Sequence, residues 1–412
     1  MRKSRSASAI RRVSLGATAA ALGAVVGVVG GTAGPVGASS PPTIHIGFEA
    51  TLSGALGTTG SSFAHGAKVA VAEINQSGGV TIHGKRYNFT LDICNDNSDQ
   101  TQVAACADKL VQTDGDLFMF GGLADYGPIV HGITEAKHVI YFSTGSAVAA
   151  LMPTSHFTVN TVPSLASRSL MSVRAFHHLY PNVKTVALLG NQDATDAAAF
   201  AQDKVAFKAV GLKLVGEQIA PDDVTDFSSL LTALKAKHPG VIWNELAANQ
   251  SSEQEMLGQN AQLQASKLVF NNSGSCLPTY PHTPGITYMA QTNTGAISVG
   301  PLEPALEKQY QVNYYKVPGA PQKPDPNINT ALFIYDFFPM LRNAIEKAGT
   351  STNVSAVLKA LNSEKYTGIN GKIGIAHDQA SYGQVICKAP NGNGKFSEIK
   401  AEPNGSLSSL SG

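Results

Sequence analysis

The chain has 412 residues, of which only 14% are charged, and its formal net charge is +1. This near-neutral balance contains no basic stripe, so nucleic acid is not an expected partner. The length is sufficient for two domains of ordinary size.

The first 38 residues have the pattern of a signal peptide. Basic residues open it, an Ala/Gly/Val-rich apolar segment spans Leu15 to Val29, and the small residues 36–38 precede Ser39. We therefore predict a signal peptide over 1–38 and an extracytoplasmic mature protein, which is secreted, on the cell surface or periplasmic. Retention of the segment as a membrane anchor is the alternative, but its glycines and the small-residue site favour cleavage.

Strand and helix patterns alternate along the first half of the mature chain, as is typical of doubly wound α/β domains. The predicted strands are Ile44–Phe48, Tyr87–Cys94, Asp116–Phe120 and Val139–Phe142. A glycine-bearing loop, 51–60, precedes a helix that ends at Gly78 and Gly79. The segment His156–Pro163 is extended, and we interpret it as a crossing between domains.

The second half repeats this architecture. Its predicted helices are Leu165–Tyr180, Asp196–Val210, Phe227–Lys237, Ser252–Leu263, Pro304–Tyr315, Asn329–Ala348 and Asn353–Leu361. Its predicted strands are Thr185–Leu189, Leu212–Ile219, Val241–Trp243 and Leu268–Phe270, followed by a return crossing at Thr287–Thr292 and a β ribbon of Lys372–Ala376 with Gln384–Cys387. We predict a first lobe of 43–158 plus 292–370, a second lobe of 159–291 plus 371–400, and a flexible tail, 401–412.

Four cysteines in an exported chain favour two disulfides, for which three pairings exist. Cys94 ends a strand and Cys106 lies in the helix that follows, so their pairing closes a short local loop and is our first choice. Cys276 and Cys387 then pair by elimination. Buried free thiols are the alternative.

The stretch 121–147 is predicted to form half of a binding site. The strand before it stops at Gly121 and Gly122, and the next strand stops at Ser143 and Thr144. Ligands of open α/β sheets bind at the carboxyl ends of strands, next to helix N-termini. The candidate ligand contacts here are Asp125, Tyr126, Thr144, Gly145 and Ser146. The alternatives are capping of the next helix by Asp125, packing of Tyr126 over the loop, and ordinary turn roles for Thr144, Gly145 and Ser146.

Other strand-end loops supply further candidates. Thr58 and Thr59 lie in the first loop, Asp193 and Thr195 in the matching loop of the second lobe, and Glu245 after the strand VIW. A solvated turn is the alternative for the second pair, and a hinge-side salt bridge is the alternative for Glu245. The first loop has the spacing GxxGxxG rather than GxGxxG, which disfavours dinucleotide binding, and we expect no cofactor.

Motifs of catalysis and metal binding are missing from the sequence. It contains no HExxH or CxxC motif, and adjacent His177 and His178 cannot face one metal from a helix. There is also no GxSxG elbow. We therefore expect neither an enzyme nor a metal site.

The order of these elements resembles the type I periplasmic solute-binding proteins, in particular the branched-chain amino acid (Leu/Ile/Val) binding family of ABC transporters. The resemblance is carried by IGFEATLSGALGTTGSSFAHGAKVAVAEIN, GGLADYGPIVHGITEAKHVIYFSTGSA, VALLGNQDATDAAAF and AIEKAG, and it spans nearly all of the mature chain. It implies two doubly wound three-layer α/β domains, joined by crossing strands at a hinge, that close over a small ligand. The implied partner is an ABC transporter permease.

The resemblance also assigns roles to single residues. Asp125 stands where a serine commonly meets the ligand carboxylate, and Thr144, Gly145 and Ser146 stand in the next contact loop. Thr195 falls where a tyrosine is expected, and Asn272 falls near the position of an acidic residue that holds the α-amino group. These departures imply that Asp125 holds the cationic end of a re-oriented ligand, or that the ligand is a neutral polar molecule such as an amide, polyol or nucleoside.

We therefore predict a monomeric, non-catalytic protein that captures a small polar ligand, an amino acid or a related amide or organic compound, between two lobes and delivers it to an ABC importer. The alternative is a ligand sensor that presents the closed form to a receptor or kinase.

Overall fold

The computed structural model describes residues 40–409 except 55, 123–125, 145–151, 193, 222–223, 247–249, 273–280, 293–303, 326 and 392–396, and the side chains of several residues that border these gaps. The predicted signal peptide therefore lies outside the described residues. Among the described residues, no helix combines the length and apolarity needed to cross a membrane.

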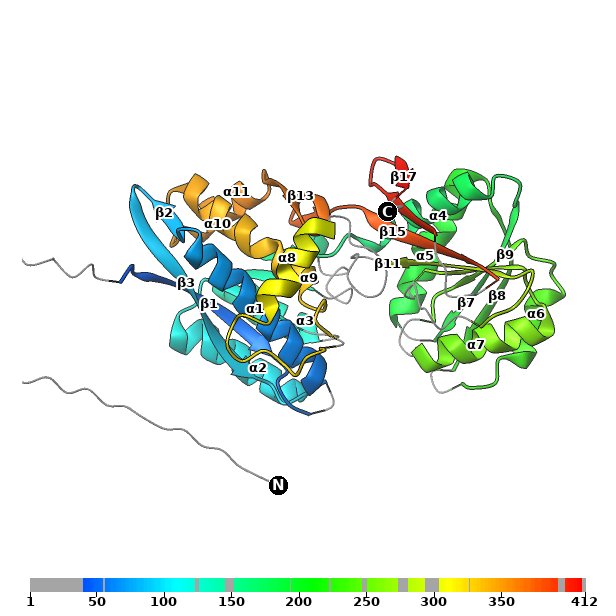
Figure 1. Ribbon diagram of the computed structural model, residues 1–412, viewed down its shortest axis with the longest axis horizontal. Coiled ribbons are helices and arrows are strands. Elements are labelled where there is room, and N and C mark those ends of the chain that lie inside the picture. Colours follow the sequence, from blue (N-terminus) through cyan, green and yellow to red (C-terminus); the bar gives the residue numbers. More distant parts are fainter. Residues whose placement is uncertain are drawn as a thin grey trace, which may run out of the picture. The chain divides into compact units, whose positions relative to one another are not determined.

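The chain forms two separate mixed sheets, each flanked by helices (Figure 1). The first sheet has the order β12-β13-β14-β6-β5-β4-β1-β3-β2. Its strands are β1 (Thr43–Ala50), β2 (Val80–Ile82), β3 (Lys85–Asn95), β4 (Phe118–Gly121), β5 (Ile140–Ser143), β6 (Thr158–Asn160), β12 (Lys365–Gly368), β13 (Gly371–Ala376) and β14 (Gln379–Ser381). Strands β3, β1, β4, β5 and β6 are parallel, as alternating strands and helices predict.

Helices cover both faces of the first sheet because its central strands are apolar on both sides. The helices of this lobe are α1 (Gly57–Gln76), α2 (Gln100–Asp108), the π-helical turn η1 (Lys109–Asp114), α3 (Gly127–Lys137), η4 (Met152–Thr154), α8 (Pro304–Tyr314), α9 (Leu332–Tyr335), α10 (Phe337–Ala348) and α11 (Val354–Leu361). Phe118 and Phe120 of β4 point into a core shared with α1, α10 and α11, whereas Met119 between them packs with α2 and α3. The period of two along β4 thus divides the core into two layers.

The second sheet has the order β17-β16-β15-β11-β10-β9-β7-β8. Its strands are β7 (Thr185–Asn191), β8 (Lys213–Ala220), β9 (Val241–Asn244), β10 (Leu268–Asn271), β11 (Thr287–Thr292), β15 (Gln384–Pro390), β16 (Ser397–Ala401) and β17 (Leu407–Ser409). Its helices are α4 (Leu165–Leu179), α5 (Ala194–Val210), α6 (Ser228–Lys235) and α7 (Gln250–Leu263). Helices α4 and α5 pack on one face, where Trp243 stacks on Phe270 at 4.1 Å, and α6 and α7 pack on the other.

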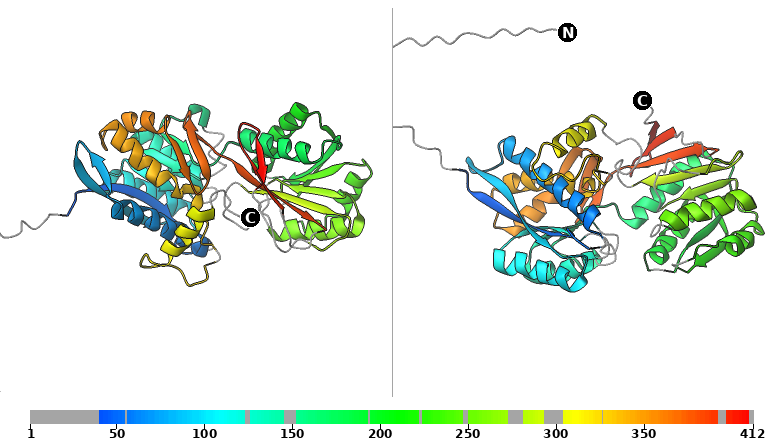
Figure 2. Two further views of the ribbon diagram at one scale, coloured as in Figure 1. Left: turned by 45° about the horizontal axis from the view of Figure 1, so that its top comes forward. Right: turned by 60° about the horizontal axis from the view of Figure 1, so that its bottom comes forward.

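The C-terminal strands differ from the prediction in three ways. Strand β13 pairs with β12 and β14 in the first sheet, whereas β15 pairs with β11 and β16 in the second, so the predicted ribbon of these two segments is wrong. Residues 371–381 accordingly belong to the first sheet and not to the second lobe. The tail is also not frayed over its whole length, because β17 pairs with β16 beside β15 and β11 (Figure 2).

Two smaller differences have local causes. The predicted helix Asn329–Ala348 is divided into α9 and α10, because Pro339 has no N–H to donate to the carbonyl of Tyr335. The crossing after the first lobe begins later than residue 158, since all of β6 is paired with β5 in the first sheet.

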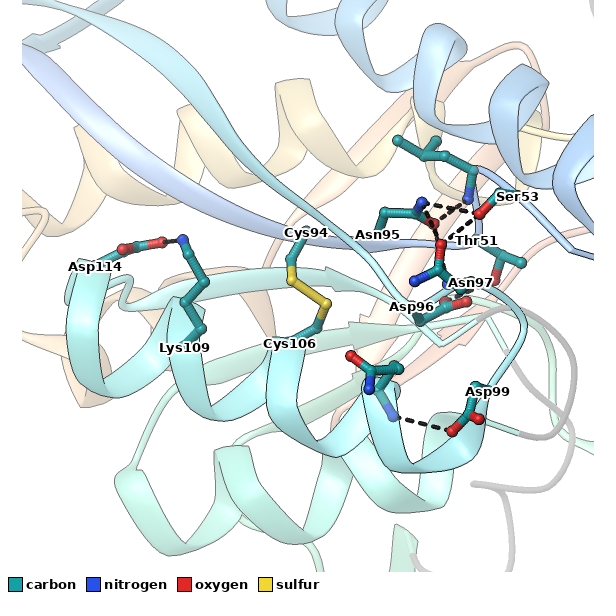
Figure 3. The surroundings of a disulfide bond; sticks show 12 residues. Thr51, Ser53, Cys94, Asn95, Asp96, Asn97, Asp99, Cys106, Lys109 and Asp114 are labelled. Atoms are coloured by element: carbon teal, nitrogen blue, oxygen red, sulfur yellow. Dashed lines mark hydrogen bonds and ion pairs between the residues drawn. A yellow bond between two sulfur atoms is a disulfide. The ribbon is translucent and has the colours of Figure 1, made fainter.

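The disulfide Cys94–Cys106 is confirmed, with a Cα–Cα distance of 5.4 Å (Figure 3). It fastens α2 to the end of β3. Cys387 is also disulfide-bonded. Its predicted partner, Cys276, lies outside the described residues.

Candidate functional site

The candidate site lies at the point of the first sheet where the chain connections diverge. From β1 the chain continues to β2 and β3, which lie on one side of β1 in the sheet. It then continues to β4, which lies on the other side of β1, and to β5 beyond β4. Helices after β1 and β4 leave on opposite faces of the sheet. In open α/β sheets a crevice forms outside the carboxyl ends of such a strand pair, and ligands bind there.

Glu49, near the end of β1, connects the two strands at this point. It is 1% exposed, and its Oε2 accepts a hydrogen bond of 2.6 Å from the backbone N–H of Gly122, just after β4. Burial and a hydrogen bond with Asp96 raise the pKa of Glu49 to about 9, although the Gly122 N–H acts in the opposite direction. The Glu49 carboxyl is therefore protonated at neutral pH. The end of β1 therefore carries no negative charge at this residue.

Asp96, just after β3, belongs to the same polar cluster as Glu49 and is fully buried. It accepts a hydrogen bond from the Thr51 hydroxyl at 2.7 Å (Figure 3) and one from the Ser98 N–H at 2.6 Å. Donors thus meet both of its carboxylate oxygens, as a buried carboxylate requires. Thr51, Asp96 and Glu49 bind the ends of β1, β3 and β4 together.

The glycine pair that ends β4 permits a close approach of backbones. Gly122 has φ +73, and a Cβ on it would lie 2.1 Å from the Tyr141 hydroxyl oxygen and 2.9 Å from Cα of Gly127. The Tyr141 hydroxyl donates a hydrogen bond of 3.1 Å to the carbonyl of Gly121. No other residue type fits at position 122 without displacing the start of α3.

Two helices begin just after these strand ends, α1 after β1 and α3 after β4. The N-cap residues of α1 and α3, Leu56 and Tyr126, make no side-chain capping hydrogen bond, and neither first turn holds an acidic residue. Helix α2 differs, because the Asp99 side chain accepts hydrogen bonds from the N–H groups of Thr101 and Gln102. The backbone N–H groups of a first helical turn and the helix dipole suit an anionic group, and α1 and α3 both begin at these strand ends.

Four predicted contact residues of the first lobe are described, and all follow β1, β4 or β5. Thr58 is exposed and Thr59 half-buried in the first turn of α1, and Thr144 is half-buried directly after β5. Tyr126 precedes α3 but is only 9% exposed and packs in the apolar cluster with Val130 and Tyr141. Asp125, Gly145 and Ser146 lie outside the described residues.

In the second sheet, two predicted residues belong to a buried polar network. Glu245 and Asn272 follow β9 and β10, are 1% and 3% exposed, and are joined by a hydrogen bond of 2.7 Å from Asn272 Nδ2 to Glu245 Oε1. Trp243 Nε1 donates to the same oxygen at 3.2 Å, and Asn272 Nδ2 also lies 3.3 Å from Asp203 Oδ1. Both predicted contacts thus bond to the protein itself.

Acidic and basic side chains lie together in this buried network. Burial and the nearby Glu245 carboxylate, to which Asp203 is hydrogen-bonded, raise the pKa of Asp203. Buried Arg168 brings a positive charge: burial lowers the pKa of its guanidinium, while Glu245 and Asp203 oppose that shift. Of the two other candidates in this lobe, Asp193 lies outside the described residues, and Thr195 is on α5 with no description of its side chain.

Sequence analysis did not identify Glu49, Thr51 or Asp96. One signal was present for Glu49, which stands in the otherwise apolar strand IGFEA. A charged residue in a buried strand needs a partner, but the partners follow other strands and cannot be found from the local pattern.

Comparison with known proteins identifies the family. The family description "Periplasmic binding protein" matches residues 43–388. The Leu/Ile/Val-binding protein BraC3 of Rhizobium johnstonii is 27% identical over 215 residues, which cover 48% of this chain and 53% of that protein. The chain thus spans about half the length of this curated relative.

Solved structures share the fold at low sequence identity. A solute-binding protein of an ABC transporter from R. palustris, in complex with 4-hydroxybenzoate, has a TM-score of 0.67 and 18% identity, with coverage of 86% of this chain and 95% of that chain. The leucine binding protein LivK from Thermotoga maritima has a TM-score of 0.62 and 16% identity, with coverage of 88% and 99%. The predicted resemblance and fold class are confirmed. Because the family match spans far more than half of the sequence, this chain belongs to the periplasmic binding protein family.

Proposed function

We propose that this protein is an exported, non-catalytic solute-binding protein that captures a small polar ligand between its two lobes and delivers it to the permease of an ABC importer. Membership of the periplasmic binding protein family supports this function and an extracytoplasmic location. The similar proteins include one named for Leu, Ile and Val and one solved with 4-hydroxybenzoate, so small carboxylic acids are the ligand class to consider first.

The observation that carries the ligand class is the pair of helix N-termini at the divergence point of the first sheet. The first turns of α1 and α3 contain no acidic residue and offer backbone N–H donors, although Pro128 supplies none in α3 and Asp125 precedes that helix in the sequence. Glu49 beneath them is protonated, with a pKa of about 9, so it does not repel an anion. A ligand carboxylate matches this arrangement of donors. The proposed ligand is an amino acid or an aromatic acid.

The proposed contacts of the carboxylate are the hydroxyl groups of Thr58, Thr59 and Thr144. Thr59 and Thr144 are half-buried at the edge where β1, β4 and β5 end, which leaves part of each side chain accessible. Asp125, Gly145, Ser146, Asp193 and Thr195 remain proposed contacts from their positions in the sequence. Glu245 and Asn272 are proposed to support the loops of the second lobe from beneath, since both are bonded within the protein.

A thermal-denaturation screen tests this proposal. The set of compounds should contain leucine, 4-hydroxybenzoate and further amino and aromatic acids, each with its amide counterpart. We expect one acid to raise the midpoint of unfolding, because a ligand that binds only the folded state stabilises it. We expect its amide to have a much smaller effect, because a hydrogen bond to a charged group contributes about 1.5–3 kcal/mol.

Calorimetry on matched variants then tests the contacts. Thr59→Val and Thr144→Val each remove a hydroxyl at nearly constant volume and should weaken binding of the identified acid about tenfold or more, from the same hydrogen-bond energies. Thr232→Val, at an exposed position of α6, is the control and should bind like the wild type. An acid and its amide that bind equally well would contradict the proposed ligand class. Unchanged affinity in both variants would remove these two hydroxyls from the site.

A further inference from the structure

A second cluster of polar side chains lies near the opposite end of β1 from Glu49. It consists of His45 on β1, Asp92 on β3 and Asp116 in the turn before β4, and one ligand atom of each residue lies within 4.8 Å of those of the other two. His45 Nδ1 is 2.7 Å from Asp92 Oδ2. The three residues are far apart in the sequence and are brought together only by the pairing of β1 with β3 and β4.

Asp116 is the unexplained member of this cluster. It is 1% exposed, and neither of its carboxylate oxygens has an N–H or hydroxyl donor in the described part of the chain; its hydrogen-bonding neighbour is the Asp92 carboxyl, another acid. Burying a carboxylate without a donor costs several kcal/mol, so it needs a proton or a cation. The absence of a side chain on Gly47 leaves room for the Asp116 carboxylate, because a Cβ on Gly47 would lie 3.0 Å from Asp116 Oδ2.

The cluster is open to ions from one side. His45 and Asp92 line a surface depression of about 500 Å³, and their side chains are 52% and 28% exposed. Lys109 and Asp114 line the same depression but are paired with each other at 2.5 Å (Figure 3). The Lys109 ammonium is thus held by Asp114.

We propose that His45, Asp92 and Asp116 form a binding site for a divalent transition-metal ion, with Zn²⁺ as the best match. One imidazole nitrogen and two carboxylate oxygens are preferred zinc ligands, and a water molecule from the depression would complete a tetrahedral site. Donor atoms around tetrahedral zinc lie about 3.3 Å apart, so binding needs only small rotations of these side chains. The sequence analysis expected no metal because these ligands form no local motif. The site is separate from the proposed ligand crevice and goes beyond the proposed solute-binding function.

The test uses the untagged full chain after removal of metals. Binding of Zn²⁺ is measured by competition with a chromogenic chelator, and Co²⁺ replaces Zn²⁺ to report tetrahedral coordination through its visible absorption. We expect one equivalent of Zn²⁺ to bind. Asp116→Asn and His45→Gln should each weaken binding about tenfold or more, since even outer partners of metal ligands contribute that much.

Asp114→Asn is the matched control, because it removes one carboxylate from the same depression without removing a proposed ligand, and it should retain zinc binding. His45→Gln changes a half-exposed position, so its result stands even where Asp116→Asn lowers stability. Three results would overturn the proposal: no zinc bound by the wild type, unchanged binding in both ligand variants, or an equal loss in Asp114→Asn. The first of these results would mean that a proton, rather than a cation, offsets the burial of the Asp116 carboxyl.

Discussion

Replacement of Glu49 by Gln should change how the stability of this protein depends on pH. The pKa of Glu49 is raised from its ordinary value of 4.5 to about 9 in the folded state, mainly by burial. Between these two pH values the folded state holds a proton that the unfolded state has released. The free energy of unfolding therefore falls as pH rises, by about 1.4 kcal/mol per pH unit from this one group. At pH 7 the accumulated cost is about 3 kcal/mol relative to pH 4.5.

Glutamine keeps the shape of the protonated side chain. Its amide oxygen can accept from the Gly122 N–H, and its NH₂ group can donate to Asp96, the two partners of Glu49 in the folded protein. Because the amide does not titrate, the stability of the variant should fall less steeply with pH than that of the wild type. Other buried acids contribute equally to both proteins and cancel in the comparison.

Urea denaturation followed by circular dichroism, at intervals from pH 5 to pH 9, measures the effect. The difference in free energy of unfolding between variant and wild type should grow in favour of the variant by about 1.4 kcal/mol per pH unit. Glu255→Gln, at an exposed position of α7, is the control and should give a curve parallel to that of the wild type. A parallel curve for Glu49→Gln as well would refute a buried, protonated Glu49.

Two further predictions concern stability. The double variant Cys94→Ser/Cys106→Ser should lower the free energy of unfolding by about 3 kcal/mol, as the chain-entropy model gives for a bridge across a sequence separation of 12. Chemical denaturation measures this loss, and a free energy of unfolding equal to that of the oxidised wild type would contradict it. Phe338→Ala should cost about 3–5 kcal/mol, because this fully buried ring stacks on Phe120 at 4.1 Å and its loss leaves a cavity. Phe338→Leu, which fills most of that space, should cost clearly less in the same measurement, and equal losses would argue against a packing role.

Local patterns in the sequence were sufficient for most of the individual elements. The run of apolar residues that stops at Gly121 and Gly122 located β4. The pairing of Cys94 with Cys106 also followed from local reasoning, because the strand and the next helix fix the positions of both residues. Such signals act within about one or two turns of chain, where neighbours in sequence are neighbours in space.

The pairing of distant strands was not accessible in this way. The ribbon predicted from β13 and β15 was wrong because alternation shows that a segment is a strand but not which strand it pairs with. Burial of Glu245 and Asn272 in one network likewise depends on two strand ends that are 27 residues apart.

The sequence by itself determined the alternation of strands and helices, the strand ends at which polar loops follow buried strands, and the resemblance to the periplasmic binding proteins. Only the tertiary structure decided that Glu49 is protonated beneath two helix N-termini and that His45, Asp92 and Asp116 meet. The physical reason is that the electrostatic environment of a side chain is set by desolvation and by neighbours from other strands, neither of which is encoded in the residues next to it.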